Sequence, residues 1–369
     1  MSDLTIESLP FIDLYVRLDQ PDQAYYRSRE KGKGVISQFV PPEYQLVVDR
    51  FMTAVTNLMK EGASDGAIDF EGLRCRLSRQ HLADGTTWVC ARRINTVLPD
   101  INKLGFGGPV LEHMHGLGKR EGLILISGAT GSGKTTTGVG LLADFLRSYG
   151  GTAITIEDPV EYMLKGRHGD GGMCYQVEVK SEEEWASCLK RALRWAPRYI
   201  YVGEIRTPKA AEQLLRAATT GHLVLTTVHA GAPEEALMGL IFLAEQAMGP
   251  GASNMLAAGI TALIYQSMKE SGPSIRYVYT EPDAPGDPIR SLIRDNKIGM
   301  ISTYIDRAAA RLSNPSLQQA TAASAMAQSL SNTAGKTPPP MPPKPGAPPP
   351  GGAPLSVVPP AAPADKKKA

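Results

Sequence analysis

The chain has 369 residues, of which 42% are hydrophobic, and its formal net charge is +2 at neutral pH. This length and composition predict two folded domains, each large enough to bury its own core. Five lysines and one aspartate follow Leu312, which gives the C-terminal stretch a net charge of +4 and the rest of the chain about −2. The folded part therefore lacks the globally basic character of a nucleic-acid-binding protein, although this charge balance does not exclude a local basic face.

The four cysteines are isolated in the sequence, and none belongs to a CxxC pair. This spacing argues against a structural zinc site. The start of the chain lacks the basic and apolar regions of a signal peptide. No apolar run approaches the roughly 20 residues that span a bilayer. We therefore predict a reducing, cytoplasmic environment with free thiols.

The first hundred residues predict a small mixed domain. Apolar side chains in residues 41–60 fall on one face of a helix that prolines precede. From residue 73 onward, apolar residues alternate with Arg74 and Arg76, and an Asp-Gly turn signal follows at residues 84–85. This pattern predicts a β-hairpin that places both arginines on the face opposite its leucines.

A connector and then an alternation of strands and helices follow. Residues 98–108 contain one proline and three glycines, as connectors between domains often do. Beyond them, apolar runs alternate with helical patterns, which indicates a parallel sheet with crossover helices. The predicted strands are residues 123–127, 153–156, 199–202 and 223–228.

A glycine-rich loop follows the first of these strands and precedes a helical pattern over residues 134–149. Its sequence is Gly128-Ala129-Thr130-Gly131-Ser132-Gly133-Lys134-Thr135. The context and the fixed positions match a P-loop, in which backbone N–H groups cradle phosphate oxygens. In such a loop, Lys134 reaches the β and γ phosphates and Thr135 places its hydroxyl on Mg²⁺. The alternative is a glycine-rich turn that binds no ligand.

Polar residues follow three of the predicted strands, at the edge where a parallel sheet binds its ligand. Glu157, Asp158 and Glu161 follow the second strand and could orient water around Mg²⁺ or accept a proton. Glu204 follows the third strand and can hold the metal through water or activate the nucleophile. His229 ends the fourth strand, where an imidazole can contact the γ phosphate. A surface acidic turn and a structural histidine are the alternatives.

Helix start signals support the same α/β interpretation. Ser181 with Glu184 forms a capping-box pattern for a helix that runs toward Ala196, and Thr207-Pro208 opens the next helix. Two further helical stretches are predicted over residues 255–268 and 288–312. Residues 255–264 are apolar almost throughout, which predicts a buried helix.

The last part of the chain is predicted to be a disordered tail over residues 313–369. Of the 29 prolines, 13 fall in the final 32 residues, so this stretch favours polyproline II structure and cannot form a core. A plain spacer is the favoured interpretation. Docking of the proline-rich tail into an SH3-like groove of an unknown partner is the alternative.

The order of the motifs GATGSGKTTT, TIEDPVEY, VGEIR, TTGH and TTVH resembles the ATPases of type II and type IV secretion systems. In layout it is most similar to the type IV pilus retraction (twitching motility) ATPases and their secretion and conjugation relatives. The resemblance covers about residues 73–312. It implies an α/β protein with a PAS-like N-terminal α+β domain and a RecA-like P-loop ATPase domain built on a parallel sheet. The expected boundaries are 1–100 for the N-terminal domain, 101–111 for the linker, 112–312 for the ATPase domain and 313–369 for the tail.

The resemblance also implies the roles of the site residues. ATP would be bound by the P-loop residues 128–135, Thr136, Glu157, Asp158 and His222, with Mg²⁺ held by Thr135 and, partly through water, by Glu204. The expected catalytic residues are Lys134, Glu161, Glu204, His229, Arg79 and Arg92. Glu161 resembles the catalytic glutamate of the family, and His222 and His229 its His box. Arginines of the N-terminal domain reach the γ phosphate in this family, for which Arg79 and Arg92 are the expected residues, with Arg74 or Arg76 as alternatives.

The sequence thus predicts an enzyme, a homohexameric ATPase that powers a pilus, secretion or conjugation machine. The resemblance implies a cytoplasmic ring attached to the inner membrane through platform or secretion-channel proteins, with no direct contact to nucleic acid. A RecA-like nucleic-acid motor is the main alternative. A small-molecule kinase and a scaffold that binds nucleotide without hydrolysis are two further alternatives.

Overall fold

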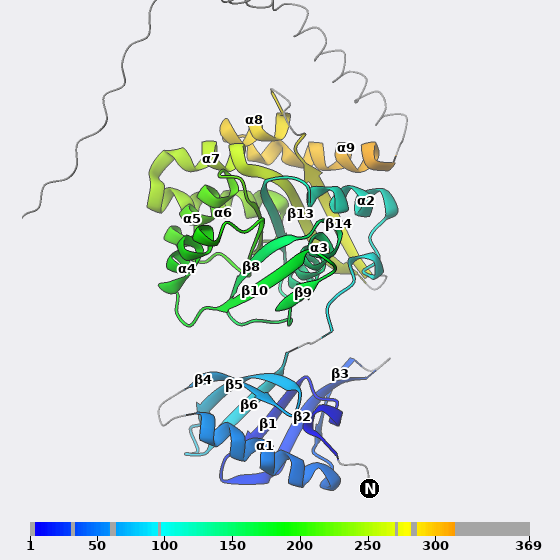
Figure 1. The fold of residues 1–369 in the computed structure, drawn as a ribbon, viewed down its shortest axis with the longest axis vertical. Helices are drawn as coiled ribbons and strands as arrows, with labels where there is room; N and C mark the ends of the chain where they lie inside the picture. Colours follow the sequence, from blue (N-terminus) through cyan, green and yellow to red (C-terminus); the bar gives the residue numbers. More distant parts are fainter. Residues whose placement is uncertain are drawn as a thin grey trace, which may run out of the picture. The chain divides into compact units, whose positions relative to one another are not determined.

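The computed structural model describes residues 4–30, 34–59, 64–94, 97–269, 272–281 and 286–313 (Figure 1). Residues Met1–Gln318 form one unit, and Gln319–Ala369 form a second unit that lies outside the described residues. The predicted proline-rich tail also lies outside them. Among the residues described, none of the helices combines the length and the apolar character needed to cross a membrane.

The N-terminal part is a six-stranded sheet with the strand order β3-β2-β1-β6-β5-β4, in which neighbouring strands are antiparallel. One helix packs on this sheet through Val48, Phe51 and Val55, which are fully buried because they recur on one helical face. The elements are η1 (Ile6–Ser8), β1 (Asp13–Arg17), β2 (Gln20–Glu30), β3 (Gly34–Phe39), η2 (Pro42–Tyr44), α1 (Gln45–Leu58), β4 (Asp65–Phe70), β5 (Leu73–His81) and β6 (Thr87–Arg93).

The predicted β-hairpin is present as the antiparallel pair β5 and β6. Leu73, Cys75 and Leu77 are buried, while Arg74 and Arg76, which alternate with them, are half-buried. The alternation arises because successive side chains of a strand point to opposite faces. The helix expected over residues 41–60 is also present, with a short 3-10 turn before it.

The second part is an eight-stranded sheet with the order β14-β13-β7-β12-β11-β8-β10-β9. The six central strands are parallel, and the edge strands β14 and β9 are antiparallel to their neighbours. The strands are β7 (Gly122–Gly128), β8 (Gly151–Glu157), β9 (Gly166–His168), β10 (Gly172–Glu178), β11 (Tyr199–Val202), β12 (Leu223–His229), β13 (Ile260–Lys269) and β14 (Gly272–Tyr279).

Helices cover both faces of this sheet (Figure 1). Along β7, Leu123 and Leu125 pack with α4 to α9, while Ile124 and Ile126 pack with α2 and α3. A strand buried on both faces reads as a continuous apolar run, which explains the pattern that predicted it. The helices are α2 (Gly108–Leu117), α3 (Lys134–Tyr149), α4 (Glu184–Ala192), α5 (Pro208–Ala218), α6 (Pro233–Met248), α7 (Ala252–Gly259), α8 (Pro288–Arg294) and α9 (Ile301–Ser313), with the 3-10 turns η3 (Ile101–Lys103), η4 (Leu193–Trp195), η5 (Gly249–Gly251) and η6 (Ile298–Met300).

The buried helix predicted over residues 255–264 is wrong. The helix α7 ends at Gly259, and the chain then enters strand β13, which pairs with β7 in the middle of the sheet. A short run that is apolar throughout fits a buried strand as well as a buried helix, because neither shows a periodic pattern. The predicted helix over residues 288–312 is likewise interrupted, by η6 between α8 and α9.

Of the two predicted helix caps, one forms and the other does not. The side chain of Thr207 accepts a hydrogen bond from Ala210 N at 3.3 Å, so it caps α5 as expected. The capping box of Ser181 does not form, because α4 begins only at Glu184 and has no side-chain cap. The carboxylate of Glu184 instead accepts a hydrogen bond from Lys180 N at 3.1 Å.

The segment expected to be a linker, residues 101–111, contains regular structure. It opens with η3, whose Ile101 is fully buried against the α3 side of the sheet, and its last residues form the start of α2. Much of this segment therefore packs as part of the second sheet's core. The predicted domain boundaries themselves stay a prediction.

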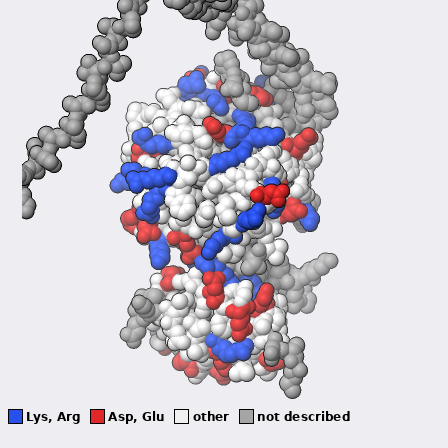
Figure 2. Space-filling view, in the orientation of Figure 1, with Lys and Arg blue, Asp and Glu red and all other residues white. Residues whose placement is uncertain are grey.

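The surface of the described residues carries both signs of charge. On the face seen in Figure 2, Lys and Arg side chains are interspersed with Asp and Glu side chains rather than forming one continuous basic region. Such a mixed face does not have the electrostatic footprint by which nucleic-acid-binding surfaces are usually recognised.

Candidate active site

The glycine-rich loop joins the buried end of β7 to the N-terminus of α3. Gly133 has φ 86°, a left-handed conformation that most side chains adopt only with strain. At Gly128, an added Cβ would lie 2.1 Å from the backbone oxygen of Gln266, so no larger residue fits there. These two glycines let the loop curl tightly in front of the helix N-terminus, as a phosphate cradle requires.

Lys134 is the first residue of α3, and it is 6% exposed. Its Nζ donates hydrogen bonds to Gly128 O and Ala129 O, both at 2.9 Å. Burial lowers the pKa of Lys134, because a desolvated ammonium loses part of its stabilisation by water. The ammonium therefore lies under the loop at the place where a negatively charged phosphate would compensate it best.

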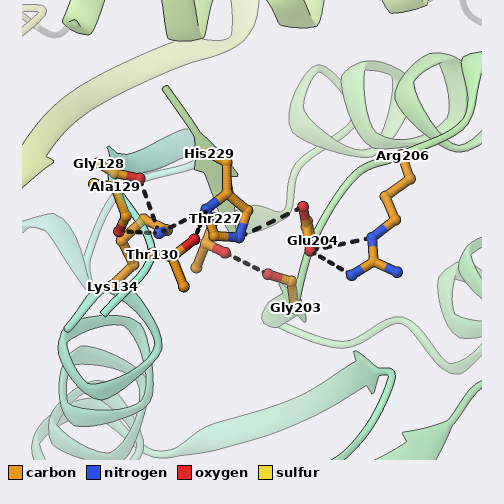
Figure 3. A network of polar contacts seen from close by, with 9 residues as sticks. All are labelled: Gly128, Ala129, Thr130, Lys134, Gly203, Glu204, Arg206, Thr227 and His229. Atoms are coloured by element: carbon orange, nitrogen blue, oxygen red, sulfur yellow. Dashed lines mark hydrogen bonds and ion pairs between the residues drawn. The ribbon is translucent and has the colours of Figure 1, made fainter. Parts of the chain in front are cut away.

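Glu204 follows β11, and His229 ends the neighbouring strand β12, so both lie at the carboxyl edge of the sheet (Figure 3). The Glu204 Oε2 atom accepts hydrogen bonds from Arg206 Nε and Nη2 at 3.1 and 2.8 Å. Its Oε1 atom lies 3.8 Å from His229 Nε2. Glu204 is thus held from one side by an arginine and approached from the other by the imidazole.

His229 connects the P-loop lysine to Glu204. Its Nδ1 atom lies 3.3 Å from Lys134 Nζ and 3.4 Å from Thr130 Oγ1. Because an ammonium can only donate, Nδ1 accepts, and this assigns the proton of the neutral ring to Nε2, which faces Glu204. Figure 3 shows the chain of contacts that results, from Lys134 through His229 to Glu204 and Arg206. These contacts connect the lysine of the glycine-rich loop to the carboxylate that follows β11.

Glu157 ends β8 and is 1% exposed. Its Oε1 accepts a hydrogen bond from Gln176 Nε2 at 3.0 Å and another from the Thr155 hydroxyl. Burial raises the pKa of Glu157 to about 7, because a carboxylate is poorly stabilised away from water, and the two hydrogen bonds oppose this only in part. Glu157 is therefore close to half protonated at neutral pH.

This raised pKa predicts a pH-dependent stability change for Glu157→Gln. In the folded chain the carboxyl group keeps its proton up to about pH 7, whereas in the unfolded chain it loses it near pH 4.5. Its burial therefore destabilises the fold increasingly from pH 4.5 to 7, by about 3 kcal/mol above pH 7. Glu157→Gln should be about 3 kcal/mol more stable than the wild type at pH 8.5 and nearly equal to it at pH 4.5. Urea unfolding of both proteins without nucleotide measures this difference, and two parallel pH profiles would contradict it.

These groups surround a pocket of about 460 Å³ at the carboxyl edge of the sheet. Most of the predicted site residues line it, including the carboxylates Asp158 and Glu161. Its walls are formed by Arg76, Thr130, Gly131, Gly133, Lys134, Thr135, Thr136, Glu157, Asp158, Pro159, Glu161, Tyr201, Gly203, Glu204, Arg206, Thr227 and His229. The hydroxyl of Thr135 and the carboxylates provide the hard oxygen ligands that Mg²⁺ prefers, so the donor set fits this ion.

The two arginines predicted to be catalytic are not among the residues that line the pocket. Arg79 donates a hydrogen bond to Met59 O at 3.1 Å, and Arg92 Nε donates to the buried Asp13 carboxylate at 2.6 Å. Both arginines are thus engaged within the N-terminal sheet. Of the two alternatives, Arg76 lines the pocket.

His222 is separated from the pocket. It directly precedes β12, and its backbone oxygen accepts a hydrogen bond from Gly122 N, the first residue of β7. His222 and His229 therefore lie at opposite ends of a seven-residue strand, roughly 20 Å apart for an extended chain. Only His229 is at the carboxyl edge where the P-loop lies, which corrects the expectation that His222 binds a nucleotide in this pocket.

Gln266 is a site residue that the sequence patterns did not reveal. It comes from β13, it is 2% exposed, and its Nε2 donates to Ser132 O at 2.7 Å. Its Oε1 accepts a hydrogen bond from Thr137 Oγ1, also at 2.7 Å. The amide thus ties the glycine-rich loop to the first turn of α3. In the sequence, Gln266 follows the stretch 255–264, which is apolar almost throughout, and no motif marks it.

We expect Gln266→Ala to weaken nucleotide binding about tenfold. The substitution leaves Ser132 O and the Thr137 hydroxyl without their partner, so the loop loses the contacts that fix its shape. Equilibrium binding of a fluorescent ADP analogue measures the effect. Gln246→Ala, which removes an exposed glutamine of α6, is the matched control. Equal affinities of the Gln266 variant and the wild type would show that the loop keeps its shape without this amide.

Taken together, a buried parallel strand, a glycine loop with a buried lysine and a carboxylate at the next strand end define a P-loop nucleotide-binding domain. The family described as Type II/IV secretion system protein matches residues 52–283 of the chain. This match covers more than half of the chain, and the chain belongs to that family. The family predicted from the sequence motifs is thereby confirmed.

Relatives of known sequence agree with this assignment. The chain is 30% identical over 275 residues to the uncharacterized protein YggR of Escherichia coli K12, which covers 73% of this chain and 82% of YggR. It is 30% identical over 187 residues to a twitching motility protein of Neisseria gonorrhoeae, a match of 50% of this chain. The chain spans 49% of the length of that relative.

Solved structures show the same fold. The pilus retraction motor PilT with bound ADP superposes with a TM-score of 0.63 and 27% identity, over 82% of this chain and 89% of PilT. The ATPase DotB of Legionella pneumophila superposes with a TM-score of 0.61 at 20% identity, over 83% of this chain and 85% of DotB. The predicted α/β fold with its parallel sheet is confirmed by these similarities.

Proposed function

We propose that this chain is a Mg²⁺-dependent ATPase that supplies mechanical work to a type IV pilus or to a type II or type IV secretion machine. The observation that carries the proposal is the convergence of Lys134, Glu204 and His229 at one edge of the parallel sheet, with His229 in contact with the other two. Membership of the family and the similarity to PilT, a pilus retraction motor solved with ADP, support it.

The residues of the pocket would have different roles in hydrolysis. The P-loop N–H groups and Lys134 bind the phosphates, and Thr135 and Glu204 are the residues that would hold Mg²⁺, Glu204 partly through water. When bound, the ion neutralises phosphate charge and so favours transfer of the terminal phosphoryl group. Glu204 and Glu161 orient the attacking water and accept its proton. His229 contacts both Lys134 and Glu204, so it is placed to report the loss of the γ phosphate.

Coupling to movement requires that the nucleotide contact more than one part of the protein. We infer that an arginine of the N-terminal sheet reaches the γ phosphate. Release of this phosphate after hydrolysis would loosen the contact and let the two parts of the protein move, as in a hinge transition. Arg76, Arg79 and Arg92 are the residues proposed for this role. The N-terminal sheet with its helix would correspond to the PAS-like domain. Six copies of the chain would form a ring on the cytoplasmic side of an inner-membrane platform or secretion channel.

The experiment that tests this function combines light scattering with ATPase assays. Chromatography of the purified full chain with Mg²⁺ and nucleotide should show six copies of the 39.5 kDa chain. Hydrolysis should not respond to added DNA or RNA. Strong stimulation by nucleic acid would favour the RecA-like nucleic-acid motor instead, because such motors couple turnover to movement on their polyanionic track.

A further inference from the structure

Two buried tyrosines on β11 differ in what their hydroxyl groups contact. Tyr199 and Tyr201 are both fully buried, and both pack on the α3 side of the sheet. The hydroxyl of Tyr199 donates a hydrogen bond to Gly118 O at 3.0 Å. The hydroxyl of Tyr201 has no hydrogen-bond partner among the described residues. A buried hydroxyl without a partner destabilises a folded protein, so its presence calls for a reason.

Tyr201 belongs to the wall of the nucleotide pocket, and its hydroxyl oxygen is buried there. Tyr201 lines the pocket together with Thr135, Glu157 and Glu161. Its ring packs on α3 one turn beyond Thr135, since a Cβ built at Gly138 would lie 2.7 Å from the Tyr201 Cε2 and 3.4 Å from its hydroxyl oxygen. The hydroxyl therefore approaches the first turn of α3 from the sheet, on the side where Thr135 provides an oxygen ligand for Mg²⁺.

Two carboxyl groups and the Thr135 side chain lie near this hydroxyl. Burial, together with the neighbouring carboxyl groups of Glu157 and Glu161, raises the pKa of Tyr201 well above its usual value of 10. The Thr135 side chain is close enough to oppose this shift slightly, but the two hydroxyls do not have the geometry of a hydrogen bond. A tyrosine hydroxyl can donate one hydrogen bond, so Tyr201 has a donor that no described residue accepts.

We propose that Tyr201 is a positioning residue whose hydroxyl finds its hydrogen-bond partner only when Mg²⁺ and nucleotide fill the pocket. This inference rests on the proposed function of the site. The hydroxyl would donate to a polar atom or water on the metal side of the phosphates, beside Thr135, and so hold that side in place. A hydroxyl that gains its hydrogen bond only on binding makes the binding of the metal with its nucleotide tighter.

The test compares Tyr201→Phe with Tyr199→Phe, which removes the same atom from the same strand. For each full-length protein, the Tm is measured without ligand, with ADP and EDTA, and with ADP and Mg²⁺. Without ligand, Tyr201→Phe should melt at the wild-type temperature or about 2 °C above it, because it loses no hydrogen bond. Tyr199→Phe should melt below the wild type, because Gly118 O loses one of its two donors and keeps only Arg198 Nη2, at 3.1 Å.

In the presence of ligands, Tyr201→Phe rather than Tyr199→Phe should differ from the wild type. The wild type and Tyr199→Phe should gain a further rise in Tm when Mg²⁺ is added to ADP, whereas Tyr201→Phe should lose most of this additional rise. The Mg²⁺ concentration that half-saturates the ADP complex should increase about tenfold in Tyr201→Phe, the usual effect of one lost hydrogen bond to a charged or polarised group. The rise in Tm with ADP alone should stay unchanged.

Three results would overturn the inference, and they are distinguishable from failure of the proposed function. An unchanged response of Tyr201→Phe to Mg²⁺, with a normal response of the wild type, refutes the role of Tyr201 alone. A fall of several degrees in the ligand-free Tm of Tyr201→Phe would show that the hydroxyl stabilises the ligand-free fold, and this result also refutes the inference. No response of the wild type to ADP or Mg²⁺ refutes the proposed nucleotide site, and the inference with it.

Discussion

Lys134→Ala is expected to reduce ATP hydrolysis about 10³-fold. The ammonium is buried under the P-loop and lines the pocket in which phosphate charge would develop, so its loss removes both binding and transition-state stabilisation. Release of inorganic phosphate at saturating ATP measures the change, and equilibrium ADP binding shows how much of it arises in the ground state.

Lys209→Ala is the matched control for this prediction, because it removes an exposed lysine of α5 that does not line the pocket. The control should hydrolyse ATP at the wild-type rate. Circular dichroism should show that both variants are folded. Wild-type turnover in folded Lys134→Ala would mean that the nucleotide is hydrolysed elsewhere in the chain.

Glu204→Gln should bind ATP with nearly normal affinity and hydrolyse it about 10³-fold more slowly. Glutamine keeps the size of the side chain and can still accept hydrogen bonds from Arg206, but it has no charge with which to hold the metal's water or take a proton. Single-turnover hydrolysis of radiolabelled ATP separates this effect on the chemical step from any effect on product release.

Glu212→Gln provides the comparison for Glu204. Glu212 pairs with Arg216 on α5, so the substitution breaks a similar ion pair of glutamate and arginine away from the pocket. Its rate should match the wild type. If Glu204→Gln hydrolysed ATP normally in a single turnover, Glu204 would have no place in the chemistry, and Glu161 would be left as the base.

The P-loop and the strands around it could be predicted because their signals are local. The glycines and Lys134 lie within one continuous stretch, and β7 is marked by a short apolar run that leads directly into this loop, as a strand buried on both faces does. Glu204 and His229 could be placed for a related reason. Each directly follows or ends a predicted strand, and parallel strands bring their carboxyl ends to one edge.

The features that the sequence did not predict depend on contacts between distant segments. Gln266 reaches Ser132 across 134 positions of sequence, and nothing near Gln266 marks it as a contact of the loop. The strand around it was mistaken for a helix because tertiary pairing with β7, not periodicity, decides its conformation. The unpartnered hydroxyl of Tyr201 is likewise visible only once α3 and β11 are packed together.

His222 shows how a motif can mislead when its geometry is not considered. The stretches TTGH and TTVH look alike, yet one ends where β12 begins and the other contains the end of β12. Because a predicted strand lies between the two histidines, the length of that extended segment is enough to place them at opposite edges of the sheet. The choice among Arg76, Arg79 and Arg92 could not be made in this way, because it depends on how sheets far apart in sequence meet around a nucleotide.

Calorimetric titration of the full chain with Mg²⁺ and ATPγS, a slowly hydrolysed ATP analogue, tests the central claim most directly. We predict one binding site per chain with a dissociation constant between about 1 μM and 1 mM, the range of typical substrate affinities. The signal should be strongly reduced in Lys134→Ala and retained in Lys209→Ala. A titration of the folded wild type that shows no binding, or binding that Lys134→Ala leaves unchanged, would contradict the account.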